Sequence, residues 1–245
     1  MIDPLSQFKI KKLIPIDLFG YDISITNSSM WMMLSTFLII SVLFLGSRGE
    51  SLRPSKMQYI CEKFYVFISD MLDDQTGGKG RVFFPYIFSI FMFVLTGNMI
   101  GLLPFSFTFT SHIIVTFALA MAVFTTVTIY GIFKHGFKFF KLFCPEGTPA
   151  FIAPLIIPVE IISYLSRPLS LSIRLFANMV AGHAMLKIFM AFVVILGTGY
   201  LLPLSVLPFA VNVLIMFFEV LVSSLQAYVF TILTCIYLND ALNLH

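Results

Sequence analysis

Residues 151–196 decide the fold of this chain: FIAPLIIPVEIISYLSRPLSLSIRLFANMVAGHAMLKIFMAFVVIL. The run has 46 residues and is apolar almost throughout, and as one continuous helix it would extend about 69 Å, more than twice the thickness of a membrane core. A second long apolar run begins at residue 201. Because neither run contains a polar turn near its middle, we expect two long, steeply tilted helices over 151–196 and 201–240. They would be joined as a hairpin near Gly197 and Pro203.

Three shorter uncharged runs precede these helices, and each is close to the roughly 20 residues that cross a membrane core. We predict membrane spans over 28–46, 82–103 and 111–133. Between the first two, residues 54–73 carry one apolar stripe at helical spacing, which predicts an amphipathic helix along the membrane surface or against a partner helix. The sequence thus predicts an all-α polytopic membrane protein with about five membrane helices and one surface helix. It is organised as an N-terminal segment, 1–27, and a single membrane domain, 28–245.

Composition indicates that lipid is the solvent of most of the chain. Hydrophobic residues make up 59% of it and charged residues 11%, whereas soluble domains have about 45–50% and 25%. This excludes a soluble globular enzyme and intrinsic disorder. The net charge of +3 lies in short polar loops, so we expect no nucleic-acid partner. Cys61, Cys144 and Cys235 are far apart and lack a C-x-x-C pair, so we expect no disulfide framework, metal site or cofactor.

The positions of the cations predict the orientation in the membrane. Nine cations fall in the connections after the first and third spans, against Lys9, Lys11 and Lys12 before the first span. By the positive-inside rule, the N-terminus faces away from the compartment that holds the positive loops. Residues 1–27 resemble neither a signal peptide nor an arginine-rich transit peptide. The protein is therefore bacterial, made inside an organelle, or present here in processed form.

The few ionisable residues inside the long runs are candidates for function, because a charge at membrane depth costs about 2.5–3.5 kcal/mol on insertion scales. Glu160, Arg167 and Arg174 follow one another at seven-residue steps, which places them on nearly one helix face. Arg174 stays charged at any ordinary pH and suits the attraction of a mobile carboxylate. Glu160, His183 and Glu219 can instead take up and release protons.

Plainer interpretations are also open for some of these residues. Arg167 and Lys187 could reach the membrane interface as anchors, since long basic side chains extend to it along apolar surface. Glu160 could simply neutralise Arg167, which lies two helical turns away.

Small residues mark two places of close helix packing. Gly97 and Gly101 form a G-x-x-x-G pair that indicates packing between this protein's own helices. Ala177 and Ala181 repeat the small-residue spacing beside Arg174 and would let a partner helix approach closely.

Several motifs resemble one known family. Residues 166–183, SRPLSLSIRLFANMVAGH, resemble the signature of subunit a of F-type ATP synthases, the stator of the proton channel. Residues 97–104, GNMIGLLP, are similar to the family's second-span motif, and residues 225–230, LQAYVF, to its last-helix motif. Residues 3–8, DPLSQF, resemble the processed start of mitochondrial members. The resemblance thus implies a protein of the mitochondrial inner membrane, with the bacterial plasma membrane as the alternative.

The resemblance also implies an assembly and a mechanism. The chain would be a non-catalytic, multi-pass subunit of a rotary ATP synthase, without a cofactor of its own. It would assemble with a c-subunit ring, a b-type peripheral stalk, other Fo subunits and lipid. Two offset half-channels would couple proton flow to rotation of the ring and so to ATP synthesis.

Residue by residue, the resemblance assigns roles in proton translocation. Arg174 would be the essential arginine that faces the ring carboxylate. Glu160 would belong to the half-channel on the matrix or cytoplasmic side. His183 and Glu219 would pair in the opposite half-channel, with the order of proton transfer between them left open. Three polar residues would accompany these groups: Asn178 and Gln226 beside Arg174, and Asp240, a weaker candidate, near the His183–Glu219 pair.

Two other classes of membrane protein remain as alternatives. A redox subunit that binds haem or quinone would use axial histidines, and only His112 and His183 lie within apolar runs. A secondary transporter would show internal repeats, yet the first three spans do not resemble the two long runs.

Overall fold

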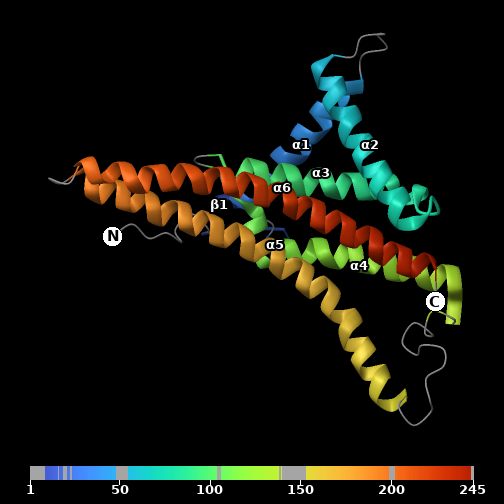
Figure 1. Cartoon of the computed structure of the whole chain (residues 1–245). Coiled ribbons are helices and arrows are strands. Elements are labelled where there is room, and N and C mark those ends of the chain that lie inside the picture. The colour runs from blue at the N-terminus through green and yellow to red at the C-terminus, as the bar shows by residue number, and fades with distance from the viewer. Residues whose placement is uncertain are drawn as a thin grey trace. The chain divides into compact units, whose positions relative to one another are not determined.

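Helices make up most of the chain in the computed structural model (Figure 1). The structure describes residues 9–15, 17–18, 21–22, 24–47, 55–103, 106–137, 139, 153–198 and 202–243. Within these residues, five helices are long and apolar enough to cross a membrane. The predicted all-α polytopic fold class is therefore confirmed. The five are α1 (Asn27–Ser47), α3 (Phe84–Gly101, extended at its start by the 3-10 turn η2, Arg81–Phe83), α4 (Ile113–His135), α5 (Ala153–Gly197) and α6 (Val206–Leu242).

The two long apolar runs each form one helix. Helix α5 has 45 residues and α6 has 37, and the 3-10 turn η5 (Leu202–Ser205) comes directly before α6. Pro158 and Pro168 lie inside α5, which continues through both positions although a proline lacks the N–H of the helical hydrogen bond. Pro208 falls in the first turn of α6, where that N–H would have no helical partner. The interpretation as two long helices, and not four short spans, is confirmed.

The amphipathic stretch forms α2 (Lys56–Thr76). Ser55 caps its start by accepting a hydrogen bond from the Gln58 backbone N–H at 3.2 Å. Gly77 ends it in the left-handed conformation, with φ of 59°, which a glycine adopts without strain. Along the apolar stripe, Ile68 is buried, whereas Met57 near the start of the helix is exposed.

Short strands before α1 were not anticipated from the sequence. β1 (Lys12–Ile14) pairs with β4 (Ile25–Thr26), and β2 (Asp17–Leu18) pairs with β3 (Tyr21–Asp22), both antiparallel. Asn27, the first residue of α1, accepts a hydrogen bond from the Lys11 backbone N–H at 3.1 Å and donates one to the Lys9 carbonyl at 3.2 Å. A single side chain thus ties the N-terminal segment to the start of the first membrane helix.

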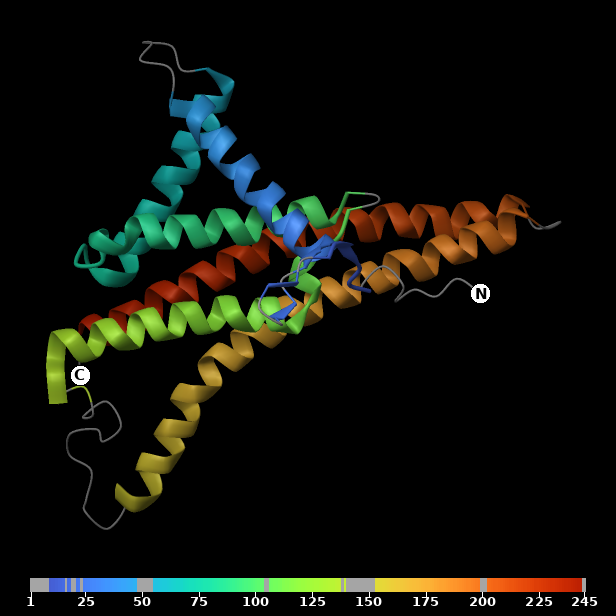
Figure 2. The same ribbon diagram turned by 180° about the vertical axis from the view of Figure 1, so that it is seen from behind.

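The chain divides into two compact units. The first comprises Met1–Ile40, Phe93–Ile113 and Leu175–Ala227, and the second comprises Ser41–Met92, Ile114–Arg174 and Tyr228–His245. In the first unit, residues 175–197 of α5 and residues 206–227 of α6 run side by side, as both views show (Figures 1 and 2). Its buried side chains include Val94, Phe109, Leu175, Met179 and Ala227.

The second unit contains α2, α4 and the end of α6. The Phe64 ring of α2 lies 5.9 Å from the Phe91 ring of α3. At the end of α4, Lys134 donates a hydrogen bond to the Leu242 carbonyl at 3.1 Å, and a His135 ring nitrogen lies 3.1 Å from the Ala241 carbonyl. Basic groups placed at the C-terminus of α6 complement the negative end of that helix dipole.

Candidate functional site

The first unit brings together His183 of α5 and Glu219 of α6, as the resemblance implied. His183 Nδ1 lies 3.8 Å from Glu219 Oε1, within ion-pair distance but too far for a direct hydrogen bond. Both residues are buried, with 9% of His183 and 3% of Glu219 exposed. The other imidazole nitrogen, Nε2, lies 2.9 Å from the hydroxyl oxygen of Thr108, so that hydrogen bond fixes the orientation of the ring.

At Gly182, the backbone of α5 leaves space that the Glu219 carboxylate occupies. A methyl group at position 182 would lie 2.5 Å from Glu219 Oε1 and 2.8 Å from its carboxyl carbon. No side chain can occupy that position unless Glu219 moves. Gly182 therefore allows the carboxylate to approach the helix that carries His183.

The loop after α3 positions Thr108. Its hydroxyl donates a hydrogen bond to the Gly101 carbonyl at 3.3 Å, and a Cβ at Gly101 would lie 2.7 Å from that hydroxyl oxygen. A Cβ at Gly97 would collide with the Phe109 ring in the same way. The interpretation of Gly97 and Gly101 as a helix–helix contact is therefore wrong, because these glycines make room for the loop and for η3 (Phe109–Ser111).

Asn178 and Gln226 form a second polar contact between α5 and α6. The Asn178 amide nitrogen donates a hydrogen bond to Gln226 Oε1 at 2.9 Å, and only 3% of Gln226 is exposed. Gln226 lies seven residues after Glu219, so both project from nearly the same face of α6. The structure thus places two of the predicted polar residues in direct contact with each other.

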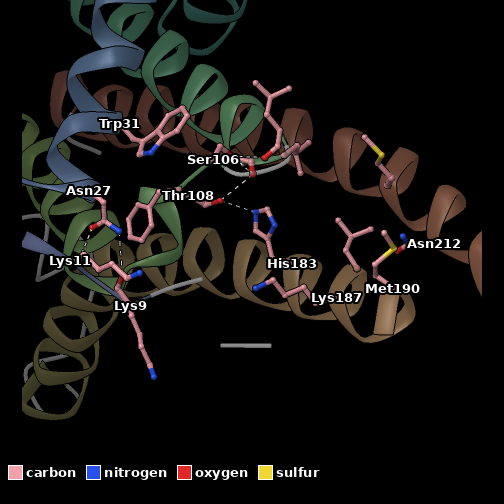
Figure 3. Close-up of a pocket in the computed structure, with 16 residues that line it drawn as sticks. Lys9, Lys11, Asn27, Trp31, Ser106, Thr108, His183, Lys187, Met190 and Asn212 are labelled. Carbon is pink, nitrogen blue, oxygen red and sulfur yellow. Dashed lines mark hydrogen bonds between the residues drawn. The ribbon is translucent and has the colours of Figure 1, made fainter. Parts of the chain in front are cut away.

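A pocket of about 870 Å³ in the first unit opens onto His183 and Thr108 (Figure 3). His183 and Lys187 project from α5 on one side, and Asn27 holds Lys9 and Lys11 on another. Three lysines, Lys9, Lys11 and Lys187, are among its described lining residues, together with apolar side chains such as Trp31 and Phe107. Lys187 therefore lines a pocket, an arrangement that the anchor interpretation did not predict.

In the second unit, Arg167 forms an ion pair with Asp240, at 2.8 Å between Nη1 and Oδ2. Its guanidinium carbon also lies 5.3 Å from the ring centre of Tyr164 and 5.1 Å from that of Tyr237. Arg167 is thus held inside the protein by a carboxylate other than Glu160. Neither the anchor interpretation of Arg167 nor its neutralisation by Glu160 agrees with this contact.

The expected role of Asp240 in the half-channel of His183 and Glu219 stays a prediction. Asp240 contacts Arg167, and on α6 it follows Glu219 by 21 residues, about six helical turns. Periodicity along one helix shows which residues share a face. It does not show which neighbouring helix a residue near the end of the chain meets.

Arg174 is an exposed residue on α5, between the fully buried Leu171 and Leu175. Among the described residues, no carboxylate lies within ion-pair distance of it. Ala177 and Ala181, the small residues that follow it, are exposed as well. Glu160, two seven-residue steps earlier, is partly exposed. This stretch of α5 therefore offers a fixed positive charge next to small side chains.

Sequence reasoning did not identify Thr108 or Gly182 as parts of the site. Thr108 lies in a short loop without periodicity, and only the tertiary fold brings it to His183. Gly182 stands inside the family-like segment directly before His183, and a glycine inside a helix is itself a signal of close approach.

No group of three or more His, Cys, Asp or Glu side chains suited to a metal ion occurs within the described ranges. Cys144 lies outside them.

Comparison with known proteins identifies the family. The family model described as ATP synthase A chain matches residues 29–239. ATP synthase subunit a of Pelagibacter ubique (strain HTCC1062) is 55% identical over 245 residues, covering 99% of this chain and 98% of that protein. ATP synthase subunit a of Chelativorans sp. (strain BNC1) is 52% identical over 98% of both chains, and that of Rhodospirillum rubrum is 50% identical over the full length of both.

These relatives are bacterial, so they favour the bacterial plasma membrane over the mitochondrial inner membrane that the resemblance of residues 3–8 suggested. Those residues lie outside the described part of the structure. The matches are neither to a haem- or quinone-binding subunit nor to a secondary transporter. This multi-pass membrane chain belongs to the ATP synthase A chain family, that of ATP synthase subunit a.

Proposed function

We propose that this chain is the proton-translocating stator subunit of a rotary ATP synthase in a bacterial plasma membrane. In this role it provides two offset half-channels and a fixed arginine, and it works against a ring of c subunits that carry carboxylates. A b-type peripheral stalk and other Fo subunits hold it in place. The observation that carries the proposal is the buried His183–Glu219 pair, in which His183 lines a pocket.

Proton uptake begins at this pocket, on the side away from the positive-inside compartment. The pocket residues Lys11, Asn27, Leu103 and Lys187 come from the segment before α1, the start of α1, the end of α3 and the second half of α5. Alternation of the spans puts all four on the side of the N-terminus. The cavity thus connects the aqueous phase of that side with His183.

The His183–Glu219 pair then passes the proton to a ring carboxylate. An imidazole and a carboxylate can each bind and release a proton, and the 3.8 Å between them leaves the transfer to a small motion or to one bridging water. A protonated ring carboxylate is neutral and can turn through lipid without the cost of a buried charge.

Arg174 separates the two half-channels. Its guanidinium remains charged, so it stabilises the ionised ring carboxylate and does not itself carry protons. Its exposure on α5, with the small residues Ala177 and Ala181 after it, supports the proposal because a ring helix can approach closely there. After nearly a full turn, the ring carboxylate releases its proton toward Glu160 and the cytoplasm.

The test is ATP synthesis by the complete complex in sealed vesicles. Arg174→Ala removes the fixed charge and should abolish synthesis driven by a proton gradient. The matched control is Arg81→Ala, because Arg81 is exposed and its carboxylate partner, Asp73, lies in α2. Coupled synthesis that survives Arg174→Ala would overturn the proposal, provided that the variant assembles in normal amounts.

A further inference from the structure

The inner face of α6 carries buried polar atoms without a hydrogen-bond partner among the described residues. Both carboxyl oxygens of Glu219, the hydroxyl of Ser223 and the amide nitrogen of Gln226 have no hydrogen-bond partner among the described residues. The exposed fractions of these residues are 3%, 0% and 3%. Their spacing, four and then three residues, places them on one helix face. A continuous line of unsatisfied polar groups therefore runs along about two turns of α6.

Asn98 of α3 joins this line from the facing helix. It is fully buried, and its amide nitrogen donates a hydrogen bond to the Ser223 backbone carbonyl at 3.3 Å. Its other amide atom, Oδ1, has no partner within the described part of the chain. Asn98 thus brings an available acceptor to the turn that carries the Ser223 hydroxyl.

Ser223 differs from three other hydroxyl-bearing residues in the helices of this protein. Ser35, Ser224 and Thr234 each donate a hydrogen bond to the carbonyl four residues earlier, at 2.8, 2.9 and 2.9 Å. A buried hydroxyl in a helix normally meets its need in this way. The Ser223 hydroxyl has no such bond, so it is available to a ligand that can both donate and accept.

Water is a ligand that suits this set of atoms. Buried polar groups without a partner are costly, and ordered water bound by two to four polar atoms is the usual solution. Glu219 and Gln226 are separated by about 10.5 Å of helix, which roughly two to three water molecules span at O–O distances of about 2.8 Å. We propose that Ser223 and Asn98 are positioning residues that hold a short chain of water between the Glu219 carboxyl group and the Gln226 amide.

The groups at the two ends of the water chain set the direction of proton transfer along it. Asn178 donates a hydrogen bond to Gln226 Oε1, and Gln226 Nε2, which has no described partner, donates to the last water. That water then directs its own hydrogens away from Gln226. At the other end, Glu219 loses a proton to the first water, and each water passes a different proton to the next. The last water passes its proton to the ring carboxylate of the proposed function. Glu219 regains its proton from His183, and His183 regains its own from the pocket, so atoms and charge balance.

This inference rests on the proposed function, and passive proton conductance of the membrane sector tests it. The measurement uses vesicles that contain the assembled complex after removal of its catalytic sector. Ser223→Ala should lower the conductance about tenfold, the factor that one lost hydrogen bond of ordinary strength produces in a rate-limiting step. Ser223→Thr keeps the hydroxyl and should retain most of the proton conductance.

Ser35→Ala is the matched control, because Ser35 is also fully buried and its hydroxyl is already bonded to the Trp31 carbonyl. It should conduct like the unmodified protein. If Ser223→Ala does not assemble, Ser223→Cys keeps a similar volume with a much weaker hydrogen-bonding group and serves in its place. The ratio of conductance in H₂O to that in D₂O should rise in either variant, which a purely structural role of Ser223 would not cause.

The outcomes separate this inference from the proposed function. If Glu219→Gln blocks conductance while Ser223→Ala conducts normally, the water chain is wrong and the proposed function stands. An equal loss in Ser223→Ala and Ser35→Ala would also overturn the inference, because packing alone would explain it. If Glu219→Gln conducts normally, the proposed function itself fails.

Discussion

His183 Nδ1 on α5 and Glu219 Oε1 on α6 lie 3.8 Å apart in a buried part of the first unit. The two residues come from different helices and stand 36 positions apart in the sequence. Their proximity depends on two further features, the Thr108 hydroxyl that orients the imidazole and the space left by Gly182. The pair therefore depends on tertiary contacts, and each of these contacts can be tested separately.

The first prediction concerns the exchange of the two ionisable groups. Either His183→Glu or Glu219→His alone should lower proton conductance strongly, because two like groups then face each other across 3.8 Å. The double exchange restores one imidazole and one carboxylate and should recover a substantial part of the conductance. Conductance in vesicles is the measurement. A double variant no better than the worse single variant would show that the two groups do not act as a pair.

The second prediction concerns Gly182. Gly182→Ala places a methyl group 2.5 Å from Glu219 Oε1, so the carboxylate must move from its present position and the His183–Glu219 distance must change. We expect proton conductance to fall about tenfold or more, as misplacement of a reacting group by about 1 Å can cost up to a hundredfold.

Gly197→Ala is the control for this substitution. It lies in the same helix, and a Cβ there would meet nothing within 4 Å. It should leave conductance unchanged. Normal conductance in Gly182→Ala would show that the carboxylate does not need its present position.

The third prediction concerns Asp240 and its ion pair with Arg167. Asp240→Asn removes the partner of Arg167 and should destabilise the complex by about 1 kcal/mol, between the values of exposed and buried pairs. We expect proton conductance per assembled complex to stay close to normal, because the carboxylate of Asp240 is engaged by Arg167. Thermal unfolding and conductance are measured on the same preparation.

The reversed pair, Arg167→Asp with Asp240→Arg, should regain part of the stability that either single change loses. Loss of conductance in assembled Asp240→Asn would put this residue in the proton path, as the resemblance implied, and contradict this prediction.

Sequence patterns could predict the helices of this protein because burial in lipid acts on each helix separately. The length of residues 151–196 and their lack of a polar turn were enough to predict α5, since a helix satisfies the backbone of a spanning segment within that segment itself. Arg174, Glu160 and Glu219 were identifiable for the same reason, as charges that lipid does not tolerate without a function. The short strands before α1 escaped prediction because each has only 2 or 3 residues, too few to show a hydrophobic period.

Contacts between elements could not be predicted in this way. Gly97 and Gly101 have the spacing of a helix contact, yet the neighbour that fills the space is the loop with Thr108 and Phe109. Asp240 has no periodic relation to Arg167, so only the packing of α5 against the end of α6 reveals their ion pair. The pairing of His183 with Glu219 was available from the family resemblance alone.

The last prediction concerns pH and the turn after α2. Arg81 donates hydrogen bonds to both Asp73 carboxylate oxygens, at 2.8 to 3.3 Å, and this bonding lowers the pKa of Asp73 below its ordinary value. Because the pKa is lower in the folded state than in the unfolded state, the stabilising contribution is fully present above the ordinary pKa of about 4. It is lost as the pH falls through the folded-state pKa, so acid should loosen the turn at residues 77–83.

Asp73→Asn should produce the same loosening at neutral pH, measured as faster amide hydrogen exchange of these residues. Asp74→Asn removes an equal charge beside it without removing a contact to Arg81 and should change little, whereas equal exchange rates in the two variants would contradict the role of the ion pair.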